Sequence, residues 1–79
     1  MIKSQHVQHL AWETHLDKIA WEGKDAGASV WYSEPCIAEL KKGSQKVYGD
    51  WWYYVDTKEL VFSSNKAYNA DEILRWAKL

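Results

Sequence analysis

Apolar residues follow a helical spacing from residue 5 onwards, and no glycine or proline interrupts them before Gly23. At about 100° per residue, one side of such a helix carries Val7, Leu10, Ala11, Thr14 and Trp21. The opposite side carries Trp12, Leu16, Ile19 and Ala20. We therefore expect a helix over residues 5–22 with two apolar sides, of which the rest of the domain covers one.

A nearly identical four-residue sequence contributes to both sides: Leu-Ala-Trp-Glu at residues 10–13 and Ile-Ala-Trp-Glu at residues 19–22. A shift of nine residues turns a helix by about 900°, which is half a turn out of phase. The uncovered side, with Trp12, Leu16 and Ile19, would then form an interface with another protein or with a second copy of the chain.

The middle of the chain alternates between turn signals and short elements. Residues 23–27 are rich in glycine and predict a turn, and residues 28–33 alternate as a short strand does. Ser33 and Pro35 then resemble a helix start, and Gly43 is suited to the helix end. The apolar side of this short helix would consist of Cys36, Ile37 and Leu40.

Residues 46–64 have the clearest pattern in the sequence, a β-hairpin with a turn around residues 56–59. Period-two alternation divides its side chains between two faces. One face would carry Trp51, Tyr53, Val55, Leu60 and Phe62. The other would carry Tyr48, Trp52, Tyr54 and Val61. Because both faces are aromatic, we expect one in the core and the other against a second layer or a partner.

Asn69 and Glu72 have the spacing of a capping box, so we expect a C-terminal helix over residues 70–78. The order of elements is then α-β-α-β-β-α. This order predicts an α+β fold in a single small domain of residues 1–79. Its short antiparallel sheet would have helices packed mainly on one face.

The composition provides material for a core, since 47% of the 79 residues are apolar and six are tryptophan. A domain of this size buries only about 60–65% of its unfolded surface, so packing or association has to stabilise it. Cys36 is the one cysteine, which excludes an intrachain disulfide and favours a reducing compartment. The chain has no signal-like start and no apolar run of about 20 residues, so we expect a cytoplasmic protein without a membrane partner.

Ten basic and eleven acidic side chains give a formal charge of −1, with both signs scattered along the chain. A duplex-DNA binder needs a basic patch, so duplex DNA is not an expected partner. A single-stranded nucleic acid is an alternative, because Tyr48, Trp52 and Tyr54 would offer stacking worth about 1–3 kcal/mol per base. The acidic residues beside them, such as Asp50, suit phosphates poorly.

Candidate catalytic residues are few. His6, His9 and His15 lack the spacing of a helical metal-binding pair, and Cys36 has the surroundings of a buried apolar thiol. The sequence carries no phosphate-binding glycine loop, no zinc-protease motif and no hydrolase nucleophile motif. We therefore expect no enzyme, no cofactor and no metal. A nucleophilic Cys36 with a histidine base is the alternative, and it predicts rapid alkylation of the thiol.

The main functional hypothesis is a small non-enzymatic protein-binding module that inhibits or modulates a larger partner by occlusion. Phage and mobile-element accessory proteins have this general character, which is an analogy of class. The candidate contact residues are Trp12, Leu16, Ile19, Tyr48, Trp52 and Tyr54. A homodimer through the helix at residues 5–22 is a further hypothesis.

Overall fold

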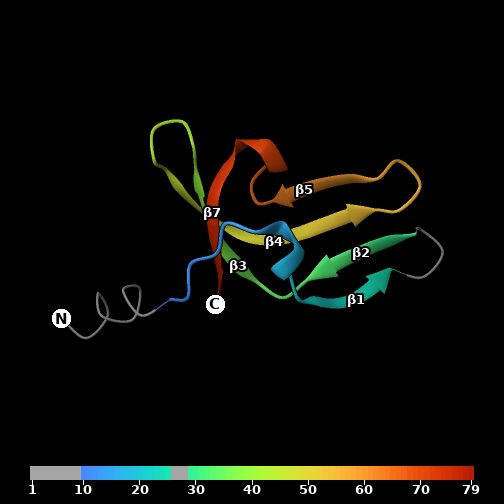
Figure 1. Cartoon of the computed structure of the whole chain (residues 1–79). Helices are drawn as coiled ribbons and strands as arrows, with labels where there is room; N and C mark the ends of the chain where they lie inside the picture. The colour runs from blue at the N-terminus through green and yellow to red at the C-terminus, as the bar shows by residue number, and fades with distance from the viewer. Residues whose placement is uncertain (1–9, 26–28) are drawn as a thin grey trace.

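The computed structural model describes residues 10–25 and 29–79, and these fold almost entirely into antiparallel β-strands (Figure 1). The strands are β1 (Trp21–Asp25), β2 (Val30–Ser33), β3 (Cys36–Leu40), β4 (Lys46–Tyr54), β5 (Glu59–Ser63), β6 (Ala67–Asn69) and β7 (Ile73–Lys78). Two 3-10 turns accompany them, η1 (Leu16–Lys18) and η2 (Ala70–Glu72). The α+β prediction is therefore wrong, because no described helix exceeds a single turn.

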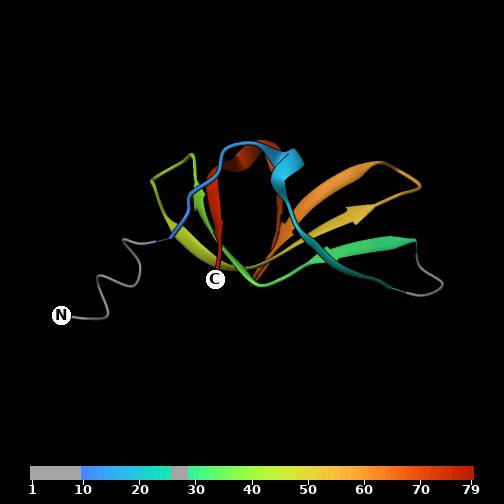
Figure 2. The same ribbon diagram turned by 60° about the horizontal axis from the view of Figure 1, so that its bottom comes forward.

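The long strand β4 organises the sheet. Its first half pairs with β3, and β3 pairs in turn with β7. Its second half lies between β2 and β5, which continue outwards to β1 and β6. Strands β1, β2 and β5 and the second half of β4 thus form one part of the sheet, called here the ribbon (Figure 1). In Figure 2 the sheet is curled, with the N-terminal segment and η2 on its inner side.

A one-residue irregularity lies between β2 and β3, which follow the same edge of β4. Tyr32 is opposite Trp52 and Cys36 is opposite Gly49, so four steps on one side match three on the other. An extra residue in a strand reverses which side chains face inwards. The hydroxyl of Ser33 fills the break in the ladder by accepting the backbone N–H of Trp51 at 2.8 Å.

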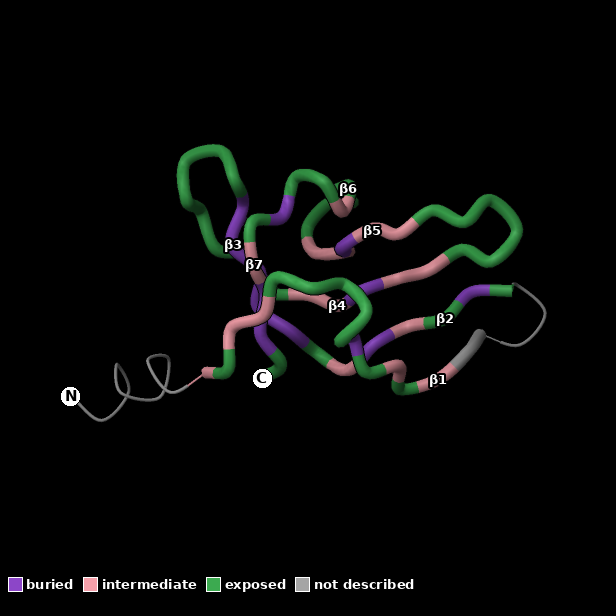
Figure 3. Tube along the Cα trace, in the orientation of Figure 1, coloured by how far each residue is buried: buried purple, intermediate pink, exposed green. Residues whose placement is uncertain are grey.

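The core lies where the two parts of the sheet meet (Figure 3). Trp51 and Phe62 are fully buried and meet edge to face with ring centroids 5.2 Å apart. Trp76 contacts Trp51 in the same manner at 6.0 Å. The other buried residues of this cluster are Ile19, Cys36, Ala38, Leu40, Val47, Tyr68 and Ile73. Edge-to-face pairs contribute about 0.5–1.5 kcal/mol beyond their buried area, so the three rings are central to stability.

The predicted helix over residues 5–22 is wrong where it can be checked. Residues 5–9 lie outside the described residues. From residue 10 the chain is extended, apart from η1, and Glu13 forms an isolated β-bridge with Trp76. Ile19 is buried in the core and Trp21 begins β1. These long-range contacts outweigh the weak local preference for a helix.

The predicted short helix after Ser33 is also wrong, because Cys36–Leu40 forms β3. All five residues of β3 are buried, since this strand lies between β4 and β7. A short apolar run has no periodicity that separates a buried strand from a helix.

The predicted C-terminal helix over residues 70–78 is reduced to η2, after which the chain becomes β7. The predicted capping box of Asn69 and Glu72 is confirmed at the start of η2, where the Glu72 carboxylate accepts the backbone N–H of Asn69 at 2.9 Å. The register of β7 against β3 shifts between Arg75 and Ile73. This irregularity puts Ile73 and Trp76 together in the core, three residues apart as in a helix.

The predicted hairpin over residues 46–64 is confirmed as β4 and β5, with Trp51 opposite Phe62 and Trp52 opposite Val61. The predicted strand over residues 28–33 is confirmed in its second part by β2. In both segments the side chains alternate between two faces of the sheet that differ in burial, and this alternation is what the sequence pattern detects.

Candidate functional site

One face of β4 carries a row of aromatic side chains. Tyr48, Trp52 and Tyr54 alternate with inward-facing residues, and Tyr32 lies beside Trp52 on the neighbouring strand β2. Tyr48 is 59% exposed and Tyr54 is 39% exposed, whereas Trp52 is half-buried. These four residues are called here the outer aromatic face.

The centre of the outer aromatic face is fixed by two contacts of Trp52. Its ring lies 5.8 Å from the ring of Tyr32 at an angle of 33°. Its indole Nε1 donates a hydrogen bond of 2.9 Å to the carboxylate Oδ1 of Asp50. Trp52 is therefore held in one orientation before any partner arrives, which lowers the entropic cost of binding.

Charges of both signs border this face. Asp50 lies between Tyr48 and Trp52 along β4, and Glu59 is opposite Tyr54 in the β4–β5 pair. Lys46 begins the strand at the other end. The carboxylates lie among the aromatic rings themselves, and the lysine lies outside them.

The opposite face of the ribbon is aromatic as well. Trp21 contacts Trp31 at 6.4 Å and Tyr53 at 6.3 Å. Trp21 and Leu60 also pack against the core cluster. Through Trp21 and Leu60 this face continues the core outwards, whereas Trp31 at its edge is 39% exposed.

The N-terminal candidates Trp12, Leu16 and Ile19 do not form one surface. Ile19 is buried in the core and Leu16 is exposed in η1. The Trp12 ring lies 4.2 Å from the guanidinium of Arg75, a cation–π contact. The proposed stripe depended on a helix that the described residues do not form.

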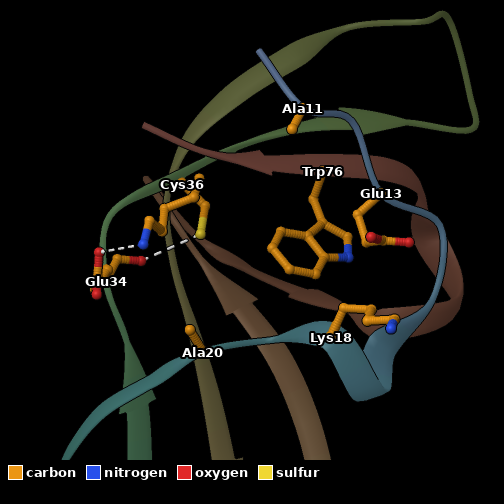
Figure 4. Close-up of a pocket in the computed structure, with 8 residues that line it drawn as sticks. Ala11, Glu13, Lys18, Ala20, Glu34, Cys36 and Trp76 are labelled. Carbon is orange, nitrogen blue, oxygen red and sulfur yellow. Dashed lines mark hydrogen bonds and ion pairs between the residues drawn. The ribbon is translucent and has the colours of Figure 1, made fainter.

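A pocket of about 210 Å³ lies between the N-terminal segment and the strands β3 and β7 (Figure 4). Residues 11–20, called here the strap, form its outer wall. Its lining residues are Ala11, Glu13, Lys18 and Ala20 of the strap, with Glu34, Cys36, Trp76 and Lys78 opposite. The pocket thus combines an indole, a thiol and charged groups of both signs.

Cys36 at this pocket is a buried free thiol. Its S–H donates to the backbone oxygen of Glu34 at 3.1 Å, and its sulfur lies 3.9 Å from the Ser33 hydroxyl. Burial raises the pKa of the Cys36 thiol, and the charges of Asp50 and Glu34 add to the rise against the opposing effects of Ser33 and Lys78. A thiol held in its neutral form is a poor nucleophile at neutral pH.

Of the three histidine candidates for a base beside this thiol, the structure describes His15 alone. His6 and His9 lie outside the described residues, and His15 is exposed beside η1. Residues 10–25 and 29–79 contain no cluster of three metal-ligating side chains. In the same residues no helix is long and apolar enough to cross a membrane.

The chain matches no family model, no curated protein and no solved structure. Function is therefore inferred from the chain's own surfaces.

Two residues at this site were absent from the sequence-based site: Tyr32, which belongs to the outer aromatic face, and Asp50, whose carboxylate holds the Trp52 indole. Asp50 could have been found, because residues two apart in a predicted strand share a face and an acceptor beside an indole N–H is a natural partner. Tyr32 could not, because the pairing of β2 with β4 depends on long-range topology.

Proposed function

We propose that this chain is a small non-enzymatic protein-binding module and that the outer aromatic face is its contact surface. Tyrosine and tryptophan are enriched in the anchors of protein interfaces, since they combine large apolar area with a polar tip. Tyr48 and Tyr54 stand exposed on either side of the fixed Trp52. A module of this kind acts by covering a surface of a larger partner, as an inhibitor or modulator does.

The observation that carries this proposal is the position of Asp50. Its carboxylate lies within the aromatic row and holds the Trp52 indole. A nucleic-acid strand stacked on Tyr48 and Trp52 would bring its phosphates close to this charge, which repels them. A protein segment has no such repeating negative charge, so a protein partner fits this face better.

A single-stranded nucleic acid is the second candidate, and one observation favours it. Lys41, Lys42 and Lys66 line a separate groove of about 550 Å³ between the β3–β4 turn and η2. Asp71 and Glu72 line the same groove and offset much of the positive charge. Binding to a nucleic acid would therefore have to be weak and strongly dependent on salt.

Two further parts of the proposal concern assembly and location. The predicted homodimer loses its basis, because it required the helix at residues 5–22. We place the protein in the cytoplasm, since a buried free Cys36 suits a reducing compartment.

The test compares two charge substitutions at exposed apolar positions. The double variant Tyr48→Glu/Tyr54→Glu changes the outer aromatic face, and Leu16→Glu is the matched control on η1. Each immobilised protein is exposed to a lysate of the source organism, and captured proteins are identified by mass spectrometry. We expect one partner to be retained by the wild type and by Leu16→Glu and to be lost with the double variant.

Other outcomes contradict the proposal in distinct ways. If Leu16→Glu alone lost the captured partner, the contact surface would lie at η1. Retention of the same partner by the double variant would exclude the outer aromatic face. Saturable, salt-dependent quenching of tryptophan fluorescence by an oligonucleotide would favour the second candidate.

A further inference from the structure

The outer aromatic face continues across the ribbon, because residues that are opposite each other in paired strands share a face. Tyr32 is opposite Trp52, and Trp52 is opposite Val61 of β5. All three are half-buried. A Cβ built at Gly23 of β1 would lie 2.7 Å from the Tyr32 hydroxyl oxygen, so the Tyr32 ring covers this glycine. These side chains form an apolar platform across several strands, with the exposed Tyr54 beside it.

The charges on this part of the face are negative. Asp50 shares the face by alternation along β4, and Glu59 is opposite Tyr54. None of the described positions that share this face in β2, β5 and the second half of β4 is a lysine or an arginine. The turn after β4 carries one charge of each sign, Asp56 and Lys58. A partner segment therefore gains from a positive charge.

The hydrogen-bonding groups of the platform select the backbone conformation of the partner. Asp50 occupies the Trp52 indole N–H, whereas the hydroxyl groups of Tyr32 and Tyr54 have no hydrogen-bond partner within the described residues. These hydroxyl groups are donors for carbonyl oxygens of a segment that lies across the face. A polyproline II segment exposes all its carbonyls because it has no internal hydrogen bonds, and its prolines have no N–H that needs an acceptor. An extended β-strand instead pairs at the edge of a sheet.

We propose that the outer aromatic face binds a proline-rich segment in the polyproline II conformation that carries a basic side chain. This inference rests on the proposed function, since it names the class of protein segment that the contact surface takes. The proline rings pack on Tyr32, Trp52 and Tyr54, because aromatic surfaces are the usual docking sites of such segments. The basic side chain lies at Asp50 or at Glu59, depending on the direction in which the segment runs.

The dimensions and the rigidity of the two partners agree. A strand rises about 3.3 Å per residue, so β4 from Tyr48 to Tyr54 spans about 20 Å. A polyproline II segment rises about 3.1 Å per residue and covers this length with about six or seven residues. Trp52 is already held by Asp50, and a polyproline II segment is preformed. Neither partner therefore loses much conformational entropy on binding.

The experiment titrates the full chain with three capped peptides of eight residues and follows tryptophan fluorescence. The first peptide has seven prolines and one arginine. The second has a glutamate in place of the arginine, and the third has seven alanines and the same arginine. We expect saturable binding of the first peptide below about 1 mM. Each of the other two should bind at least about tenfold more weakly, since one loses the attraction of the carboxylates and the other loses the preformed conformation.

Matched variants assign the contact of the basic side chain. Asp50→Asn/Glu59→Gln should weaken the proline–arginine peptide about tenfold and remove its advantage over the glutamate peptide. The amide oxygen of the asparagine still accepts the Trp52 indole N–H, so the platform stays in place. Asp17→Asn/Asp71→Asn is the control, because it makes the same change of charge at exposed positions of η1 and η2. This control should bind the peptide as the wild type does.

The aromatic contact has its own variant. Tyr54→Ala removes an exposed ring and should weaken the proline–arginine peptide about tenfold. An unchanged urea midpoint verifies that each variant is folded.

Four results would overturn the inference: no saturable signal up to about 1 mM peptide, equal binding of the alanine and proline peptides, equal binding of the arginine and glutamate peptides, or an equal loss with the control. The lysate capture with Tyr48→Glu/Tyr54→Glu tests the contact surface separately. A partner that is lost with that double variant although no peptide binds would refute the proline-rich ligand and leave the proposed function standing.

Discussion

Replacement of Arg75 by methionine tests what holds the strap against the sheet. The Arg75 Nε donates to the Glu39 carboxylate at 2.7 Å, and the guanidinium stacks on Trp12. Methionine retains an apolar stem but provides no charge and no donor. Arg75→Met therefore leaves the Glu39 carboxylate without its cation and leaves the Trp12 ring without its stacking partner.

The exposure of the two side chains sets the magnitude. Breaking a fully buried ion pair costs about 3–5 kcal/mol, and an exposed pair contributes about 0–1 kcal/mol. The Glu39 side chain is 9% exposed and the Arg75 side chain is 40% exposed, so this pair lies between the limits, at about 2 kcal/mol. The lost cation–π contact adds about 0.5–1 kcal/mol. For a domain of this size, the combined loss lowers the Tm by about 10 °C or more.

The assay is urea unfolding followed by tryptophan fluorescence, on the wild type, Arg75→Met, Glu39→Gln and the double variant. Glu39→Gln removes the charge that Arg75 compensates, so the double variant should be less unstable than the sum of the two single losses. We expect a coupling free energy of about 1–2 kcal/mol. A loss below about 0.5 kcal/mol for Arg75→Met, or additive losses in the double variant, would refute the role assigned to this pair.

Two further predictions concern a glycine and the buried thiol. A Cβ at Gly49 would overlap the backbone carbonyl of Ser63, so Gly49→Ala should lower the free energy of unfolding by about 3 kcal/mol, measured in urea. Gly43 has a positive φ and open space around it, so Gly43→Ala should lower this free energy by only about 1 kcal/mol. Equal losses for the two variants would contradict this prediction. Because burial raises the pKa of Cys36, the folded state favours the neutral thiol. That stabilisation is complete below the unfolded pKa of about 8.5 and is lost as the pH rises through the folded value. The stability of the wild type relative to Cys36→Ala should therefore fall as the pH rises above about 8.5, by up to about 1.4 kcal/mol per pH unit, and a constant difference would contradict the burial of the thiol.

The hairpin was predictable because successive residues of its strands point to two faces that differ in burial. Trp51 is buried and its neighbour Trp52 is half-buried, so residues of the two faces alternate along the strand and the sequence shows this two-residue period. The alternation also places Tyr48, Trp52 and Tyr54 on one face without knowledge of the fold. Sequence alone therefore yields most of the outer aromatic face.

The helices were mispredicted because irregular strands reproduce helical spacing. The shift between Arg75 and Ile73 puts Ile73 and Trp76 on the same side, as three residues of helix would. The break at Ser33 has a related effect, since it reverses the inward side between β2 and β3. Such irregularities depend on how distant strands pair, so the spacing of apolar residues along the sequence does not reveal them.

The pocket beneath the strap was not predictable for the same reason. Glu13 and Trp76 are far apart in the sequence, and their backbone pairing holds the strap beside the strands β3 and β7. Glu13 and Lys18 taken alone have the pattern of ordinary exposed charges. Their place in the lining of the pocket follows from the fold.

The aromatic residues differ in how far packing explains them. Trp51 and Trp76 form the core, and Tyr32 and Trp52 pack against each other on the outer side of the ribbon. Within the described residues, Tyr48 and Tyr54 make no ring contact with another aromatic side chain, and both stay exposed. A small domain that needs its apolar area for stability gains little from these two rings in the free state. This exposure is why the charge substitutions that test the proposed contact surface are placed at these two positions rather than at Trp52.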